Sequence, residues 1–352
     1  MPGAPTQLPQ ITADVGSPSA ADADRDALMV RLGNALNTRA VPTSFWECLQ
    51  VADLSALRTF IQEAEAAPRL CEMVSETLYA LPRMWCQKPP KDRSSSCSSS
   101  SRSNLSDDVP RPKSARKTAK ERDGGMCVVT GREEVQVCHI LPSCLLKKKK
   151  PTDLTRSIPD MWTMLSLFFD NDDVIKWKNA VSPNLSEPTD SIPQNLICLS
   201  SSVQEDWAEG YCAFKPLRES ERELECEFHW LPREGHGPTD NVDLSKHPSS
   251  TAGLSSSAGR FSHTFEGDRI ESGFRFVLKT TDPETHPLPS FTLLQMSWKL
   301  SRILALSAAA VEDPDLDDDD ESETYDKDLI DKWMAEVSDD DDNEVSLQES
   351  DT

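Results

Sequence analysis

Apolar residues recur at helical spacing in the first part of the chain. Leu28, Leu32 and Leu36 fall on one helical face, and a second apolar stripe follows over residues 54–61. This spacing predicts a small helical N-terminal module over residues 21–87. Two polar stretches flank it: residues 1–20, predicted to be disordered, and residues 88–112, a linker rich in Ser, Lys, Arg and Pro.

In the middle of the chain, short apolar runs replace the helical spacing. Residues 128–129 and 135–140 flank a polar turn and predict a β-hairpin whose second strand ends at His139. Downstream, Ser202 opens an S-x-x-E capping box, so a helix is predicted to begin near Ser202 and to carry Gln204 in its first turn. The pattern therefore predicts two strands followed by a helix.

Composition limits how much of the chain can fold. Among 352 residues there are 25 Pro, and only 37% of the residues are hydrophobic, so long segments are predicted to stay unfolded. The longest mainly apolar stretch, residues 303–311, is too short to span a bilayer. We therefore expect a soluble intracellular protein, nuclear or cytoplasmic, with no membrane partner. Ten cysteines without a C-x-x-C pair indicate reduced thiols rather than a zinc ribbon or a disulfide framework.

Charge is concentrated at one end of the chain. Residues 312–352 contain twenty acidic residues against Lys327 and Lys332, a net charge of −18 out of a total of −23. Such a segment is predicted to be a disordered acidic tail. Within it, apolar residues share one helical face, as expected for binding in the groove of a basic protein partner, namely Leu329, Ile330, Trp333, Met334 and Val337. The alternative is a solubilising tail with incidental apolar residues.

Four short motifs define the central segment. They are Cys127-Val-Val-Thr-Gly131, Cys138-His139-Ile140, Asn195-Leu-Ile-Cys-Leu199 and the segment from Trp207 to Pro216. Together they resemble fungal proteins built around an HNH endonuclease domain of the ββα-metal superfamily. The resemblance implies a hairpin that presents a His to deprotonate water, a helix that presents a metal ligand, and a divalent ion between them.

The resemblance continues outside the central segment. Residues 161–177 place Trp and other apolar residues at helical spacing, and residues 227–232, 272–278 and 287–300 follow the order of the C-terminal part of those fungal proteins. The expected fold class is α+β: a ββα-metal (HNH-like) domain over residues 113–217, and a C-terminal extension of strands and a helix over residues 218–311. The helical module, the linker and the acidic tail complete the chain.

The resemblance also assigns roles to individual residues. His139 matches the catalytic base, and Asn195 matches the Asn whose amide ties the loop together and orients the His. Cys138 stands where the family usually has a metal-binding Asp or His, and Gln204 stands in place of the closing His. With these ligands a divalent ion (Mg, Mn, Ni or Zn) is expected to bind weakly. The alternatives are a buried strand cysteine at 138 and a solvated helix residue at 204.

Two basic runs flank the predicted hairpin and could contact the phosphates of DNA or RNA. They contain Arg111, Lys113, Arg116, Lys117, Lys120 and Arg122 before it, and Lys147, Lys148, Lys149 and Lys150 after it. The alternatives are a nuclear-import signal at residues 111–122 and a solvated loop at residues 147–150.

Two functions follow from these assignments. The first is an HNH nuclease-like protein that binds nucleic acid and hydrolyses phosphodiester bonds. The second is an inactive HNH-fold interaction module with an acidic partner-binding tail.

Overall fold

The computed structural model describes residues 20–78, 80–85, 113–141, 161–181, 192–232, 236–237, 240–248, 262–264 and 266–307. Four predicted features lie wholly or almost wholly outside these residues: the disordered N-terminus, the linker, the four-lysine run and the acidic tail. No helix in the described ranges is both long and apolar enough to cross a bilayer.

Most helices and strands of the described chain fall in separate runs, and the strands pair antiparallel, so the fold class is α+β. The helices are α1 (Ala20–Leu36), α2 (Thr43–Val51), α3 (Leu54–Ala66), α4 (Pro68–Thr77), α5 (Ala80–Trp85), α6 (Lys113–Arg122), α7 (Met161–Ser166), α8 (Asn171–Val181), α9 (Ser201–Ala208) and α10 (Phe291–Ser307). The strands are β1 (Ala40–Pro42), β2 (Val135–His139), β3 (Leu196–Ser200), β4 (Cys212–Glu219), β5 (Glu223–Trp230), β6 (Asn241–Asp243), β7 (Ser262–His263), β8 (Arg269–Ile270) and β9 (Phe274–Lys279).

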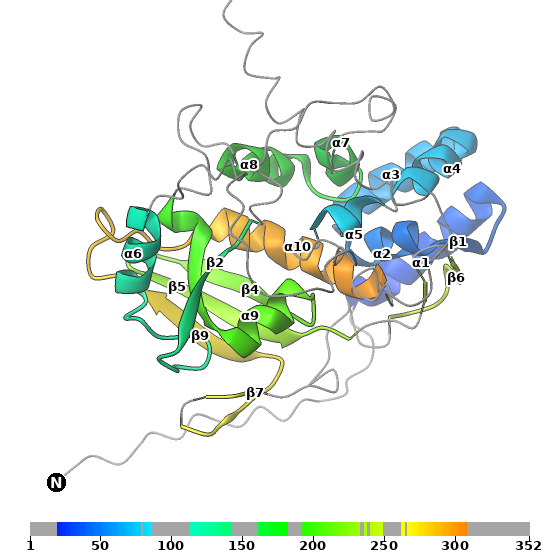
Figure 1. Cartoon of the computed structure of the whole chain (residues 1–352). Coiled ribbons are helices and arrows are strands. Elements are labelled where there is room, and N and C mark those ends of the chain that lie inside the picture. The colour runs from blue at the N-terminus through cyan, green and yellow to red at the C-terminus, as the bar shows by residue number, and fades with distance from the viewer. Residues whose placement is uncertain are drawn as a thin grey trace, which may run out of the picture.

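The largest sheet is antiparallel with the order β4-β5-β9, and α10 lies along β4 at its edge (Figure 1). From there α10 continues toward α2 and α5, while α8 packs on its other side (Figure 1). The helix begins where the Ser290 hydroxyl accepts a hydrogen bond from the Leu293 amide (3.3 Å), which is an N-cap. Apolar residues then cover most of its surface, as expected for a helix buried on several sides.

The N-terminal helices share this core. The segment predicted as a small helical module contains α1 to α5 and also the short strand β1. Its buried residues, from Leu28 to Trp85, belong to the same apolar cluster as those of α10. In addition, β1 pairs with β6, with Val41 opposite Val242. Both ends of the described chain are therefore packed together.

The predicted hairpin is wrong in its first strand. Residues 128–129 lie in a turn, closed where the Gly131 amide donates to the Cys127 carbonyl (2.8 Å) and Gly131 takes a φ of 70°. The partner of β2 is instead β3, in antiparallel register with Cys138 opposite Ile197. All five residues of β3 are buried, so this strand fits between other elements better than the short run at 128–129 does.

Candidate functional site

The strand pair β2–β3 is followed directly by α9, which packs on both strands. The helix expected near Ser202 is confirmed, but it begins at Ser201, and its N-cap residue Ser200 makes no side-chain capping bond. The capping box predicted at Ser202 is therefore not formed. Val203 and Trp207 of α9 are buried in the core, whereas Gln204 is half-buried.

His139 is the last residue of β2, opposite Leu196 of β3, and is half-buried. Strand side chains alternate between faces. Val137 packs with Leu196 and with Ala119 of α6, whereas Cys138 belongs to the main core. His139 therefore lies on the face of the strand pair that α6 covers.

Asn195 is fully buried and holds the backbone that follows His139. Its Oδ1 accepts a hydrogen bond from the Leu141 amide (2.8 Å), and its Nδ2 donates to the Leu141 carbonyl (3.4 Å). The Asn195 carbonyl also accepts from the Ile140 amide (2.9 Å). These three bonds fix the two residues after His139 against the start of β3. Such geometry is suited to the orienting role that the resemblance implies.

Cys138 is a buried thiol. Burial raises its pKa to about 12, the nearby Cys127 adds to this, and Arg116 opposes it. At neutral pH the group therefore keeps its proton, whereas metal coordination requires the thiolate. Cys138 thus behaves as a small apolar residue of the core.

A divalent ion of the kind used by HNH enzymes does not fit the residues predicted to bind it. Cys138 is protonated and faces the core, and Gln204 offers only a neutral oxygen. Among the described residues, no group of three or more His, Cys, Asp and Glu side chains is placed to hold a metal ion. We therefore derive no chemical step from a metal at these two positions.

The basic residues before the turn, apart from Arg111, which lies outside the described residues, lie on α6 and differ in accessibility. Lys117 and Lys120 are exposed, and Lys117 approaches Glu121 at 3.6 Å. Arg116 is half-buried and donates to the Val137 carbonyl of β2 (3.1 Å). This bond holds its guanidinium close to the strand that ends at His139.

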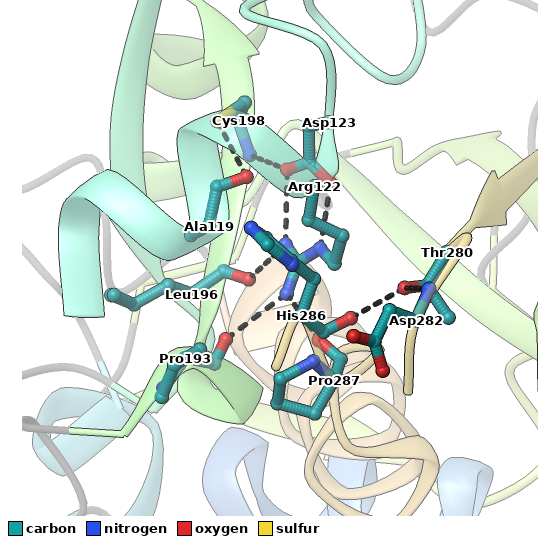
Figure 2. Close-up of polar contacts among 10 residues, drawn as sticks. All are labelled: Ala119, Arg122, Asp123, Pro193, Leu196, Cys198, Thr280, Asp282, His286 and Pro287. Carbon is teal, nitrogen blue, oxygen red and sulfur yellow. Dashed lines mark hydrogen bonds and ion pairs between the residues drawn. The ribbon is translucent and has the colours of Figure 1, made fainter. Parts of the chain in front are cut away.

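The interpretation of Arg122 as a phosphate-contacting residue is wrong. Its side chain has no exposed surface and forms an ion pair with Asp123 (2.7 Å). It also donates to the carbonyls of Pro193, Leu196 and Pro287, as Figure 2 shows. The sequence did contain a signal for this burial: Ala115, Ala119 and Arg122 have the i, i+4, i+7 spacing of one helix face.

Residues 127–215 match the family model of the HNH endonucleases. This match supports an HNH superfamily assignment for the segment. It also supports a nuclease-like function related to nucleic acids. No curated protein and no solved structure matches the chain. The matched HNH segment contains β2, β3 and α9 together with His139 and Asn195.

Proposed function

We propose that this protein binds nucleic acid through an HNH-type core, in which β2, β3 and α9 form the ββα unit, and that His139 is its candidate general base. The match of residues 127–215 to the HNH endonucleases carries the proposal. HNH enzymes act on phosphodiester bonds, so the expected ligand is the sugar–phosphate backbone of DNA or RNA.

Two features of the described residues support this proposal. The bonds from Asn195 to Ile140 and Leu141 fix the backbone next to His139, which is the positioning that a general base needs. On the same side, α6 exposes Lys117 and Lys120, whose ammonium groups can contact phosphates. The base and the cations therefore belong to one side of the strand pair.

Fluorescence anisotropy of labelled duplex DNA, single-stranded DNA and RNA, titrated with the full chain over a salt series, tests the binding. We expect log K to fall linearly with log salt concentration, as it does when lysines replace counterions on phosphates. A chain that binds none of the three at low salt would contradict the proposal.

Hydrolysis is tested separately with plasmid DNA in manganese. If the wild-type chain cleaves, His139→Ala should abolish cleavage while leaving the circular dichroism spectrum and the anisotropy titration unchanged, because only the base is lost. His247→Ala changes an exposed His outside the matched HNH segment and serves as the matched control. Equal cleavage by the His139→Ala chain would show that His139 is not the base.

The buried, protonated Cys138 favours a second candidate function, an HNH-fold interaction module that binds without hydrolysis. Here, the acidic tail recruits a basic protein partner. Nucleic-acid binding without cleavage in magnesium, manganese, nickel or zinc would select this function. Cleavage that depends on His139 would reject it.

A further inference from the structure

The buried pair of Arg122 and Asp123 joins three segments that are far apart in the sequence. Arg122 Nε and one NH2 hydrogen contact the two Asp123 oxygens (2.7 and 2.9 Å), and the remaining donors reach the carbonyls of Pro193, Leu196 and Pro287 (3.1, 2.8 and 3.1 Å). All five N–H groups of the guanidinium are therefore used. Figure 2 shows the guanidinium enclosed by these acceptors.

These contacts hold the backbone before and after Asn195 in the sequence. Arg122 holds the carbonyls of Pro193 and Leu196, and Asp123 Oδ2 accepts a hydrogen bond from the Cys198 amide (3.0 Å). Next to Pro193, the Gln194 carbonyl accepts from the Ser290 amide (2.8 Å), so the segment before α10 supports the same backbone. The backbone that carries Asn195 is thus fixed on both sides.

From Asn195 the contacts continue to the candidate base. Its carbonyl and its amide side chain hold Ile140 and Leu141, the two residues that follow His139. We propose that Arg122 and Asp123 are positioning residues for His139, acting through Asn195. The supporting residues of the site then extend outside the matched HNH segment, to the end of α6 and to Pro287.

The guanidinium geometry explains why a lysine cannot replace Arg122. A lysine has the same charge but only three donors on one nitrogen, so it cannot serve Asp123 and three separate carbonyls together. Arg122→Lys therefore leaves at least one of these four partners without its donor. We expect this loss to loosen the backbone around Asn195 while the buried charge is kept.

Amide hydrogen exchange on the full chain distinguishes positioning from a general contribution to stability. In Arg122→Lys we expect exchange at the Ile140 and Leu141 amides to accelerate at least about tenfold more than at two reference amides outside the network. The references are Leu231, which donates to the Tyr211 carbonyl (2.8 Å), and Leu244, which donates to the Arg39 carbonyl (2.7 Å). An equal acceleration at all four amides, or none, would overturn the proposal.

Arg31→Lys is the matched control, because Arg31 forms an exposed ion pair with Glu65 (2.9 Å) far along the chain from the network. It should leave the exchange pattern unchanged. If Arg122→Lys does not fold, Asp123→Asn provides a second, isosteric variant with the same expectation. Hydrogen exchange of the wild-type chain at low urea concentrations gives a test that needs no variant. The amides of Cys198, Ile140 and Leu141 should exchange with one common free energy of opening. An independent opening of the Leu141 amide would overturn the proposal.

The role of His139 rests on the proposed function, whereas the exchange measurement does not. A chain that binds no nucleic acid but shows selective exchange at Ile140 and Leu141 would contradict the proposed function and keep the network. A chain that binds nucleic acid but exchanges uniformly would contradict the network alone. A second readout is the NMR chemical shift of the His139 ring protons at fixed pH, which should change in Arg122→Lys and stay fixed in Arg31→Lys.

Discussion

At the scale of single residues, Cys138 and Gln204 decide whether the HNH segment can hold a metal in the usual way. Burial keeps the Cys138 thiol protonated, since its pKa is raised to about 12. Gln204, half-buried on α9, contributes a neutral oxygen at best. Neither is a good ligand for a transition metal, which prefers imidazole or thiolate donors.

We therefore predict weak divalent-metal binding by the unaltered chain. Gln204→His should raise the affinity for nickel or zinc about tenfold or more, because an imidazole replaces the amide on α9. Isothermal titration calorimetry on the full chain measures both affinities. The control adds Cys138→Ala to the Gln204→His chain. This second substitution should leave the affinities of that chain for nickel and zinc unchanged. Tight binding by the unaltered chain that is lost in Cys138→Ala would contradict the description of Cys138 as a core residue.

At the scale of elements, His229 links β5 to α10. Its ring lies 5.0 Å from the Trp298 ring between centroids, and its Nε2 is 3.4 Å from a Glu227 oxygen. Its Nδ1 is buried and has no hydrogen-bond partner among the described residues. Burial lowers the pKa of His229, Lys215 and Arg302 lower it further, and Glu227 opposes the shift.

This lowered pKa predicts a pH-dependent stability. The folded chain binds a proton at His229 less readily than the unfolded chain does. The free energy of unfolding is therefore unaffected by this group above about pH 6.5, and it decreases as the pH falls from that value toward the pKa of the folded state. Urea unfolding between pH 8 and pH 5 should show a steeper loss for wild type than for His229→Asn. His247→Asn, which alters an exposed His, should follow wild type. Parallel wild-type and His229→Asn curves would contradict this prediction.

The sequence predicted the individual strands and helices of the site better than it predicted which strands pair with each other. An apolar run predicts β2, and His139 lies at the end of that strand as expected. The helix expected near Ser202 is present as α9, although the capping box that predicted it is not formed. The pairing of β2 with β3 was missed, because the two strands are separated by an insertion that contains α7 and α8. Strand pairing over such a distance depends on the whole core rather than on local pattern.

The burial of Arg122 was missed for a related reason. A run of basic residues before the turn suggests a solvated surface, and most such runs are exposed. Arg122 is buried because Asp123 neutralises it and because carbonyls from residues 193, 196 and 287 satisfy its donors. All three carbonyls lie at least 71 residues from Arg122 in the sequence, so the local pattern contains no information about them.

At the scale of the whole molecule, charge is divided between the acidic C-terminal residues and the rest of the chain. Residues 312–352 have a net charge of −18, which leaves −5 for everything before them. The 17-residue helix α10 is roughly 25 Å long; it begins just after Pro287, which Arg122 of α6 contacts, and runs toward α2 and α5. The tail that follows α10 must therefore cover about this distance to reach the lysines of α6. A disordered chain, as the sequence predicts for the tail, covers it within about 20 residues.

We predict that the tail competes with nucleic acid for the lysines of α6. Deleting residues 312–352 should strengthen DNA binding several-fold at low salt and steepen its salt dependence, because phosphates reach cations that carboxylates otherwise occupy. Anisotropy over a salt series compares the two chains. A tail of equal length, with residues 317–321 and 339–342 changed to Asn and Gln, is the matched control; it removes nine of the twenty acidic residues and should shift binding in the same direction as the deletion, by a smaller amount. Superimposed curves for all three chains would instead favour a tail that recruits a separate basic partner.

We propose that nucleic acid contacts the exposed surface of α6, on the side of the strand pair where His139 lies. The most direct measurement is the salt dependence of DNA binding by Lys117→Ser/Lys120→Ser, compared with Lys176→Ser/Lys279→Ser, which removes two equally exposed lysines from α8 and β9. If each α6 lysine contacts one phosphate, the first variant should bind more weakly, with a slope of log K against log salt that is shallower by about 1.8. The second variant should match wild type. Equal slopes for the α6 variant and wild type, or a loss confined to the α8/β9 variant, would show that the α6 lysines do not contact the nucleic acid.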